Sequence, residues 1–165
     1  MRRIGVVALL MLAACSKSLS PAEQAAQDAR DVAMVEKANR GAGVPIAPQP
    51  ILLPDMQANS LFGTGCAFVA KNAGVGAVML ARADGGYLKL DDAVVRFAAD
   101  TGSKALPYGI YARYAGKRYA FELSLASEKP RRTGMESSDY DGRLRVQDAK
   151  GHIVYDQFGT VQCGN

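Results

Sequence analysis

Several residue types and motifs are scarce or missing in this sequence of 165 residues. It contains no tryptophan, a single histidine (His152) and three cysteines. No H-E-x-x-H, C-x-x-C, G-x-S-x-G or phosphate-loop pattern occurs, so the short signatures of zinc hydrolases, dithiol oxidoreductases, serine hydrolases and P-loop proteins are missing. The apolar run at residues 4–14 is much shorter than the roughly 20 apolar residues of a membrane-spanning helix. These absences argue against a permanent span here and leave no motif that indicates catalysis.

The start of the chain is typical of an export signal. Arg2 and Arg3 precede the apolar run, and polar residues follow it from Ser16 onward, which is the order of a signal peptide. Leu12-Ala13-Ala14-Cys15 resembles a bacterial lipobox. The resemblance implies that residues 1–14 are removed and that Cys15 is acylated on its sulfur and on its new amino group. The alternative is an ordinary secretory signal with a cysteine there by chance.

The resemblance also implies a location. Several acyl chains give long-lived anchoring, because each buried CH₂ contributes about 0.8 kcal/mol. Ser16 is not the aspartate that resembles an inner-membrane retention signal, so we expect a periplasm-facing lipoprotein of the outer membrane. Removing Arg2 and Arg3 leaves 18 of the 20 lysines and arginines against 16 acidic residues. Such a small excess in an exported protein indicates no nucleic-acid partner.

The next segment is predicted to be a helix followed by a tether. Ser20-Pro21-Ala22-Glu23 has the residues of a capping box, with proline at the first helical position. A helix to about Arg40 would end at Gly41 and Gly43, and its alanine-rich faces would bury little area. Four prolines between positions 45 and 54 favour an extended chain. We therefore expect residues 15–54 to tether a domain of residues 55–165.

From about Gln57 the apolar pattern changes to a period of two residues, with glycines at intervals that suit short strands. This predicts a mainly β domain of seven or eight antiparallel strands, either a small β-sandwich or a partly open barrel. The first strands are expected at residues 66–70, 77–83, 87–90 and 94–98. Turns are expected at Asp84-Gly85-Gly86 and Asp91-Asp92.

A first hairpin is predicted around Gly116-Lys117. With that pair as the turn, Tyr114 faces Tyr119 on the buried side and Tyr111 lies on the other side. A turn at Ala115-Gly116 is less favourable, because it places two arginines opposite each other.

A second hairpin is predicted around Asp148-Ala149-Lys150-Gly151, which fits a type I turn closed by a glycine at positive φ. In that register Val146 faces Ile153. The same register places Leu144 opposite Tyr155 and Arg143 near Asp156.

Two cysteines remain if Cys15 carries lipid. Cys66 opens the first expected strand and Cys163 ends the last, and an exported protein meets an oxidising compartment. We expect a disulfide that joins the two ends of the sheet, with two buried free thiols as the alternative. The bond would contribute on the order of 4–5 kcal/mol in the chain-entropy account.

Candidate catalytic and metal-binding groups are few. His152 lies beside a hairpin turn, where an exposed polar residue is ordinary, and Ser124, His152 and Asp156 form a triad on paper only. The acidic segment at residues 136–142 lacks the spacing of a twelve-residue calcium loop, so a solvated loop is the simpler interpretation. We predict no catalytic residue, no metal site and no cofactor.

Two long loops are candidate contact surfaces, because loops on a rigid sheet often carry function. The first, at residues 100–109, exposes Ser103 and Lys104. The second, at residues 127–142, has a basic half that contains Lys129, Arg131 and Arg132. A plain connection is the simpler interpretation of each loop.

The positions of Cys66, the loop at residues 101–105 and Cys163 resemble the layout of lipid-anchored inhibitors of c-type lysozyme. In that family a compact barrel has its first and last strands joined by a disulfide, and a serine-glycine-rich loop enters the lysozyme cleft. The S-G-x-x-Y core of the family is not present, since Gly102 precedes Ser103 and Tyr108 follows Leu106-Pro107. The later tryptophan of the family is missing as well.

The sequence thus predicts a lipid-anchored, non-catalytic β domain with a binding or envelope-structural role. Its expected partners are the membrane, through the anchor, and an envelope protein or a peptidoglycan-related ligand. A lysozyme-inhibitor-like module is the second hypothesis, and a hydrolytic enzyme is the third.

Overall fold

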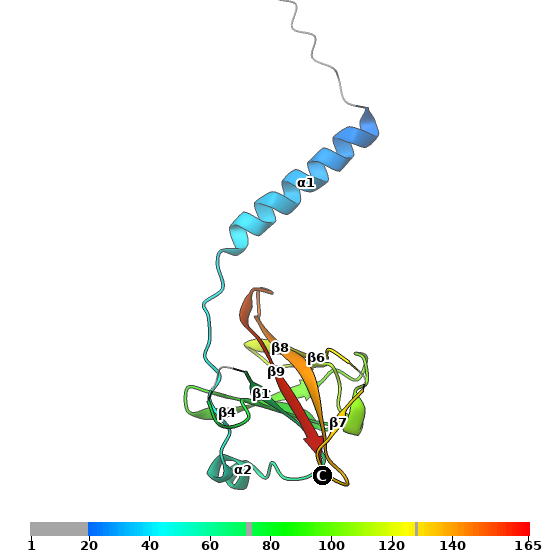
Figure 1. Cartoon of the computed structure of the whole chain (residues 1–165). Coiled ribbons are helices and arrows are strands. Elements are labelled where there is room, and N and C mark those ends of the chain that lie inside the picture. The colour runs from blue at the N-terminus through cyan, green and yellow to red at the C-terminus, as the bar shows by residue number, and fades with distance from the viewer. Residues whose placement is uncertain (1–19, 72–73, 128) are drawn as a thin grey trace, which may run out of the picture. The chain divides into compact units, whose positions relative to one another are not determined.

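The computed structural model describes residues 20–71, 74–127 and 129–165, and the chain divides into two units between Gly41 and Ala42 (Figure 1). The expected signal segment, residues 1–14, and Cys15 lie outside the described residues. The first unit contains helix α1 (Pro21–Arg40), and the second contains a β-barrel with its flanking segments.

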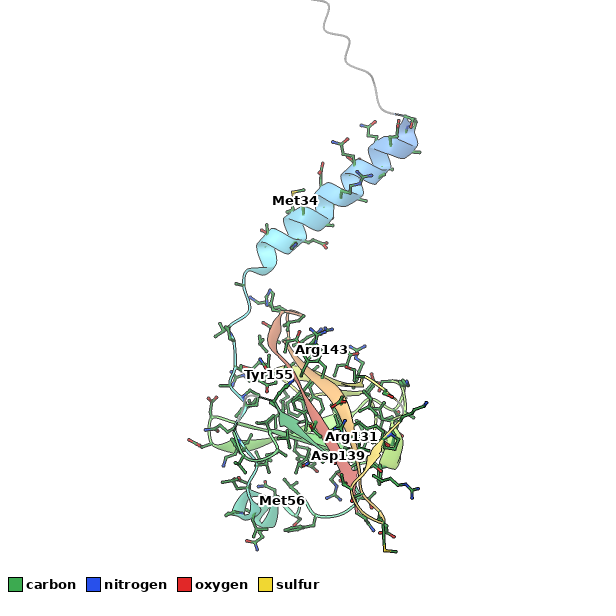
Figure 2. The ribbon with its side chains drawn as sticks, in the orientation of Figure 1. Met34, Met56, Arg131, Asp139, Arg143 and Tyr155 are labelled. Carbon is green, nitrogen blue, oxygen red and sulfur yellow. A yellow bond between two sulfur atoms is a disulfide. The ribbon has the colours of Figure 1, made fainter. Side chains whose placement is uncertain are left out.

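Helix α1 has the predicted cap. The Ser20 hydroxyl accepts from the Glu23 N–H, and the Glu23 carboxylate accepts from the Ser20 N–H at 2.8 Å. The hydroxyl of Ser20, followed by its N–H, holds the pKa of Glu23 below its ordinary value. Gly41 ends the helix at a φ of +73°. Its larger apolar side chains, such as Met34 in Figure 2, are exposed, as expected for a helix without a continuous apolar stripe.

Eight antiparallel strands close into a barrel in chain order, and β9 returns to pair with β1. The pairing of β6 with β8 closes the sheet. A ninth strand, β7, pairs with the start of β8 outside the barrel. The strands are β1 (Gly65–Ala70), β2 (Met79–Arg82), β3 (Gly85–Leu90), β4 (Ala93–Ala99), β5 (Arg113–Ala115), β6 (Tyr119–Leu125), β7 (Arg131–Arg132), β8 (Ser138–Asp148) and β9 (Ile153–Gly164). The predicted mainly β class is confirmed, and closure removes the free edges of the sheet.

The core lies inside the barrel. Alternate residues of each strand point inward, as the period of two requires, and Tyr114, Phe97 and Phe121 meet at its centre. The Tyr114 ring stacks on Phe121 with centroids 4.8 Å apart, and Phe97 meets Phe121 edge to face at 5.1 Å. Gly86 makes room for them, because a Cβ there would lie 2.3 Å from the Phe121 ring.

Of the two turns that flank β3, one was predicted correctly and the other was not. Asp91-Asp92 forms the predicted turn with φ of +50° and +61°, the left-handed geometry of a tight hairpin. The turn before β3 is Ala83-Asp84, and the two glycines predicted there belong to the strand. Gly85 is needed in the strand because a Cβ there would lie 2.9 Å from the Phe97 carbonyl oxygen.

The predicted register of the first hairpin is wrong by two residues. Tyr114 pairs with Phe121, and the turn is Lys117-Arg118, closed by a hydrogen bond from the Gly116 N–H to the Tyr119 carbonyl at 2.8 Å. A Cβ at Gly116 would lie 3.0 Å from the Phe97 ring, so packing explains this glycine. The observed register also places Arg113 opposite Glu122, a favourable cross-strand pair. The predicted contrast between a buried Tyr119 and an outer Tyr111 fails, since both are partly buried against the core.

The turn of the second hairpin was predicted correctly, but its strand register was not. Gly151 has a φ of +82° and its N–H donates to the Asp148 carbonyl, as predicted. A bulge after Val146 shifts the pairing, so that Val146 faces Tyr155 and Leu144 faces Gln157. The predicted partners of the two aliphatic residues are therefore wrong, and Ile153 is about half exposed at 51%. Such a bulge inserts an unpaired residue and cannot be read from a regular alternation.

One ion pair of this hairpin was predicted correctly. Arg143 on β8 forms a bidentate ion pair with Asp156 on β9, and Arg145 approaches the same carboxylate at 3.6 Å. The hydrogen bond from Arg143 holds the pKa of Asp156 below its ordinary value. Arg143 and Tyr155, labelled in Figure 2, both lie on this long hairpin.

The chain from residue 42 to residue 61 is packed on the barrel. Helix α2 (Leu53–Asn59) and its flanks cover the outer face of β2–β4, where Ile51, Leu61 and Tyr87 form a second small core. Asp55 on α2 binds the Lys89 ammonium at 2.9 Å. The Leu52 N–H, followed by Lys89, holds the pKa of Asp55 below its ordinary value. Part of the stretch expected to be a tether is thus fixed to the domain.

Candidate functional site

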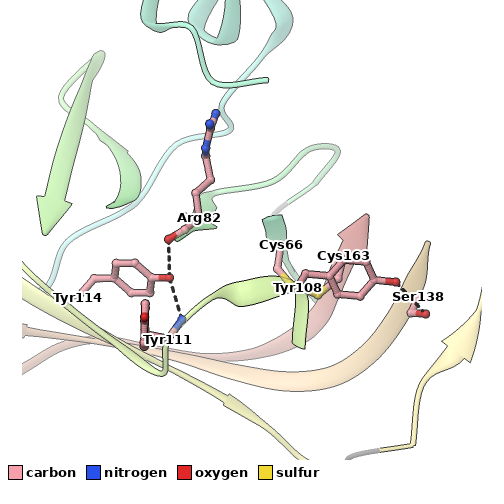
Figure 3. Close-up of a disulfide and its surroundings, with 7 residues drawn as sticks. All are labelled: Cys66, Arg82, Tyr108, Tyr111, Tyr114, Ser138 and Cys163. Atoms are coloured by element: carbon pink, nitrogen blue, oxygen red, sulfur yellow. Dashed lines mark hydrogen bonds between the residues drawn. A yellow bond between two sulfur atoms is a disulfide. The ribbon is translucent and has the colours of Figure 1, made fainter. Parts of the chain in front are cut away.

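The predicted disulfide joins β1 to β9. Cys66 and Cys163 are opposite each other in the register, are bonded, and lie buried in the barrel (Figure 3). Figure 3 also shows Tyr108 beside the bond, where its hydroxyl donates to the buried Ser138 at 3.3 Å. The bond closes the ring of strands where the first and last strands meet, which is a structural position.

In the first candidate loop, residues 100–109, the Ser103 side chain points inward and the Lys104 side chain does not. The Ser103 hydroxyl donates to the Asp100 carbonyl at 2.7 Å and accepts from the Arg113 N–H at 3.1 Å. This hydroxyl stabilises the loop and is not presented to a partner. Lys104 is exposed and borders a cleft of about 430 Å³ that Leu106 and Leu125 also line.

The second candidate loop forms the extra strand β7. Lys129, Arg131 and Arg132 are all exposed, and Arg131 forms an ion pair with Asp141 at 2.9 Å. Figure 2 labels Arg131 and Asp139, which are partners in the β7–β8 register. Within the described ranges no group of three His, Cys, Asp or Glu side chains could hold a metal ion.

Ser124, His152 and Asp156 do not form a catalytic triad in this structure. His152 Nδ1 lies 2.7 Å from Asp148, and hydrogen bonding from His152 holds the pKa of Asp148 below its ordinary value. The Ser124 hydroxyl contacts the Arg143 carbonyl, and Asp156 binds Arg143. His152 Nε2 is buried without a hydrogen-bond partner in the described part of the chain. Gly43 lies directly against the His152 side chain, so close that a Cβ on this glycine would be 2.6 Å from the Cβ of His152.

A cleft that the sequence did not predict opens onto the barrel core. Its volume is about 730 Å³, within the roughly 300–1,000 Å³ of small-molecule sites. Val95 and Phe97, on the inner face of β4, and Tyr119 on β6 form its apolar floor. Residues 44–47, the β3–β4 turn and the β5–β6 turn form its walls. We call it the strap cleft.

The strap, residues 43–49, is held at several points. Ile46 packs against the barrel core, and its N–H donates to the Val154 carbonyl at 3.0 Å. Gln49 donates from its backbone to Lys89, and its side chain exchanges two hydrogen bonds with Asp92 at 3.0 and 2.7 Å. These bonds fix one wall of the cleft. An isoleucine between two prolines was the only sequence signal for this contact.

The rim of the strap cleft is mainly basic. Lys117 and Arg118 form the β5–β6 turn, and Asp91 is the one carboxylate that lines the cleft. The Arg118 guanidinium lies over the Tyr119 ring, 5.3 Å from its centroid, and Lys117 is exposed without an ion pair to any described residue. Arg96 also lines the cleft, but its guanidinium donates to the Asp84 carbonyl at the other end of β3. The positive charge available to a ligand therefore comes from the turn.

No protein-family model, curated protein or solved structure matches this chain. Among the helices in the described ranges, none is both long and apolar enough to span a membrane.

Proposed function

We propose that this protein is a lipid-anchored, periplasm-facing outer-membrane protein whose barrel is a non-catalytic binding module. The strap cleft carries the proposal, because a concave, mainly apolar site with a few polar groups is the usual form of a small-molecule site. The partners of Ser124, His152 and Asp156 support binding over catalysis. The natural ligand would be a component of the envelope, such as a peptidoglycan-related or lipid-related molecule.

The anchoring part rests on Cys15. In the intact envelope form, mass analysis should show loss of residues 1–14 and added acyl mass. Cys15→Ser should move the protein from the membrane fraction to the soluble fraction, because the acyl chains supply the attachment. Equal membrane retention of the two forms would contradict lipid anchoring.

The binding part can be tested with a neutral apolar dye, Nile red, on the full chain carrying Cys15→Ser. Dye fluorescence should rise on binding. Ala93→Trp should abolish the rise, because Ala93 lies on the same face of β4 as Val95 and lines the cleft. Ala98→Trp is the matched control, since Ala98 is exposed on the other face of the same strand. Dye binding that survives Ala93→Trp would place the apolar site elsewhere.

A lysozyme-inhibitor-like module is the second candidate. A closed barrel with a disulfide between its first and last strands favours it. The inward Ser103 hydroxyl disfavours insertion of that loop, so Lys104 and its cleft would make the contact. A stoichiometric complex with c-type lysozyme, weakened by Lys104→Glu, would select this function. A substrate-dependent rate abolished by His152→Ala would select a hydrolase instead.

A further inference from the structure

We propose that the strap cleft binds a single-chain amphiphile with an anionic headgroup, of the fatty-acid type. The inference rests on the proposed binding function and specifies its ligand. Three features of the cleft support it: its apolar floor, its fixed strap and the charge of its rim.

The floor suits an alkyl chain. Val95 and Tyr119 pack against the barrel core but are left partly uncovered at this end, and Phe97 is buried beside them. The strap adds Val44, which is 78% exposed, and Ile46. An alkyl chain in this space would remove apolar surface from water on both sides, which is the main favourable term for such ligands.

The strap forms a fixed wall of the cleft. The strap is tied to β9 through Ile46 and to the β3–β4 turn through Gln49, so the cleft lies between a fixed strap and β4. A single alkyl chain is the occupant that we assign to the space between these two walls.

The rim selects an anion. Lys117 and Arg118 stand at the β5–β6 turn, where the cleft meets solvent, and one carboxylate, Asp91, lies on the opposite turn. A carboxylate or phosphate at this position would meet two cations, and a guanidinium is suited to two parallel hydrogen bonds with such a group. A cationic or zwitterionic head would gain less from the same rim.

The experiment uses the full chain with Cys15→Ser and a fluorescent long-chain fatty acid, cis-parinaric acid, with its methyl ester as the neutral probe. The acid should bind more tightly than the ester. Lys117→Glu combined with Arg118→Glu should weaken binding of the acid by about tenfold, because two attractions become repulsions. The ester should bind the double variant as it binds the parent. Both side chains are in an exposed turn, so the melting curve should be preserved.

Ala93→Trp should abolish binding of both probes, and Ala98→Trp should leave both unchanged. If Ala93→Trp does not fold, Ala47→Trp on the strap replaces it, since Ala47 lines the cleft and is exposed. Binding of the acid that survives a folded cleft-filling variant would overturn the assignment to this cleft.

The remaining outcomes separate the two proposals. Equal affinities for acid and ester, with no effect of the charge reversal, would overturn the anionic ligand class but leave an apolar binding module. Absence of binding for Nile red and for both parinaric probes would overturn the binding module itself.

Discussion

Replacing both Cys66 and Cys163 by serine should lower the free energy of unfolding by about 4–5 kcal/mol, the chain-entropy contribution of a loop that spans 97 residues. The two cysteines are opposite each other on the first and last barrel strands, so their bond restricts the unfolded chain from one end of the barrel to the other. Urea unfolding of the full chain with Cys15→Ser, compared with and without the two serines, measures the difference. The strand content at low temperature should not change.

The thiol count provides the control for this result. In the Cys15→Ser background the unfolded, unreduced protein should contain no reactive sulfur. Two reactive thiols would show that Cys66 and Cys163 are not bonded in the protein. In that case the serine replacements should cost little more than the loss of two buried sulfur atoms.

Tyr114→Ala should destabilise the barrel by about 3–5 kcal/mol, in the range for loss of a large buried aromatic side chain. The Tyr114 side chain is fully buried, stacks on Phe121, donates from its hydroxyl to the Arg82 carbonyl at 2.9 Å and accepts from the Tyr111 N–H at 3.0 Å (Figure 3). Burial also raises the pKa of this hydroxyl. Urea unfolding at constant m-value measures the loss.

Tyr114→Phe divides this loss into packing and hydrogen bonding. It keeps the ring but leaves the Arg82 carbonyl and the Tyr111 N–H without their partner, which should cost about 1–3 kcal/mol. Tyr119→Ala is the matched control, because Tyr119 lies on the same hairpin but is only partly buried. A phenylalanine as damaging as alanine would show that the two hydrogen bonds, and not the stacked ring, hold this part of the core.

Features that depend on neighbours in the sequence were predicted well. The Ser20 cap and Gly41 define α1 because both act within one turn of the helix. The strands of the mainly β fold follow from alternation, which depends on each residue and its near neighbours. The disulfide was also accessible, because only two cysteines remained for the domain and they flank the strand region.

The registers of the two hairpins could not be predicted from such local patterns. A shift by one residue would turn every side chain to the wrong face, but a shift by two keeps the faces and changes only the partners. The alternation therefore cannot distinguish a turn at Gly116-Lys117 from one at Lys117-Arg118. The Phe97 ring beside Gly116, from a strand about twenty positions earlier, favours the second turn.

The sequence by itself determined the helix cap, the β class and the pair of bonded cysteines, because each is encoded by a local pattern or by a short count of residues. Only the tertiary structure decided that the sheet closes and that the proline-rich strap lies over the barrel. Ile46 meets the core more than a hundred positions before its hydrogen-bond partner Val154, and no local pattern encodes a contact at that distance. The strap cleft exists only because these distant segments meet, and it therefore could not be predicted from the sequence.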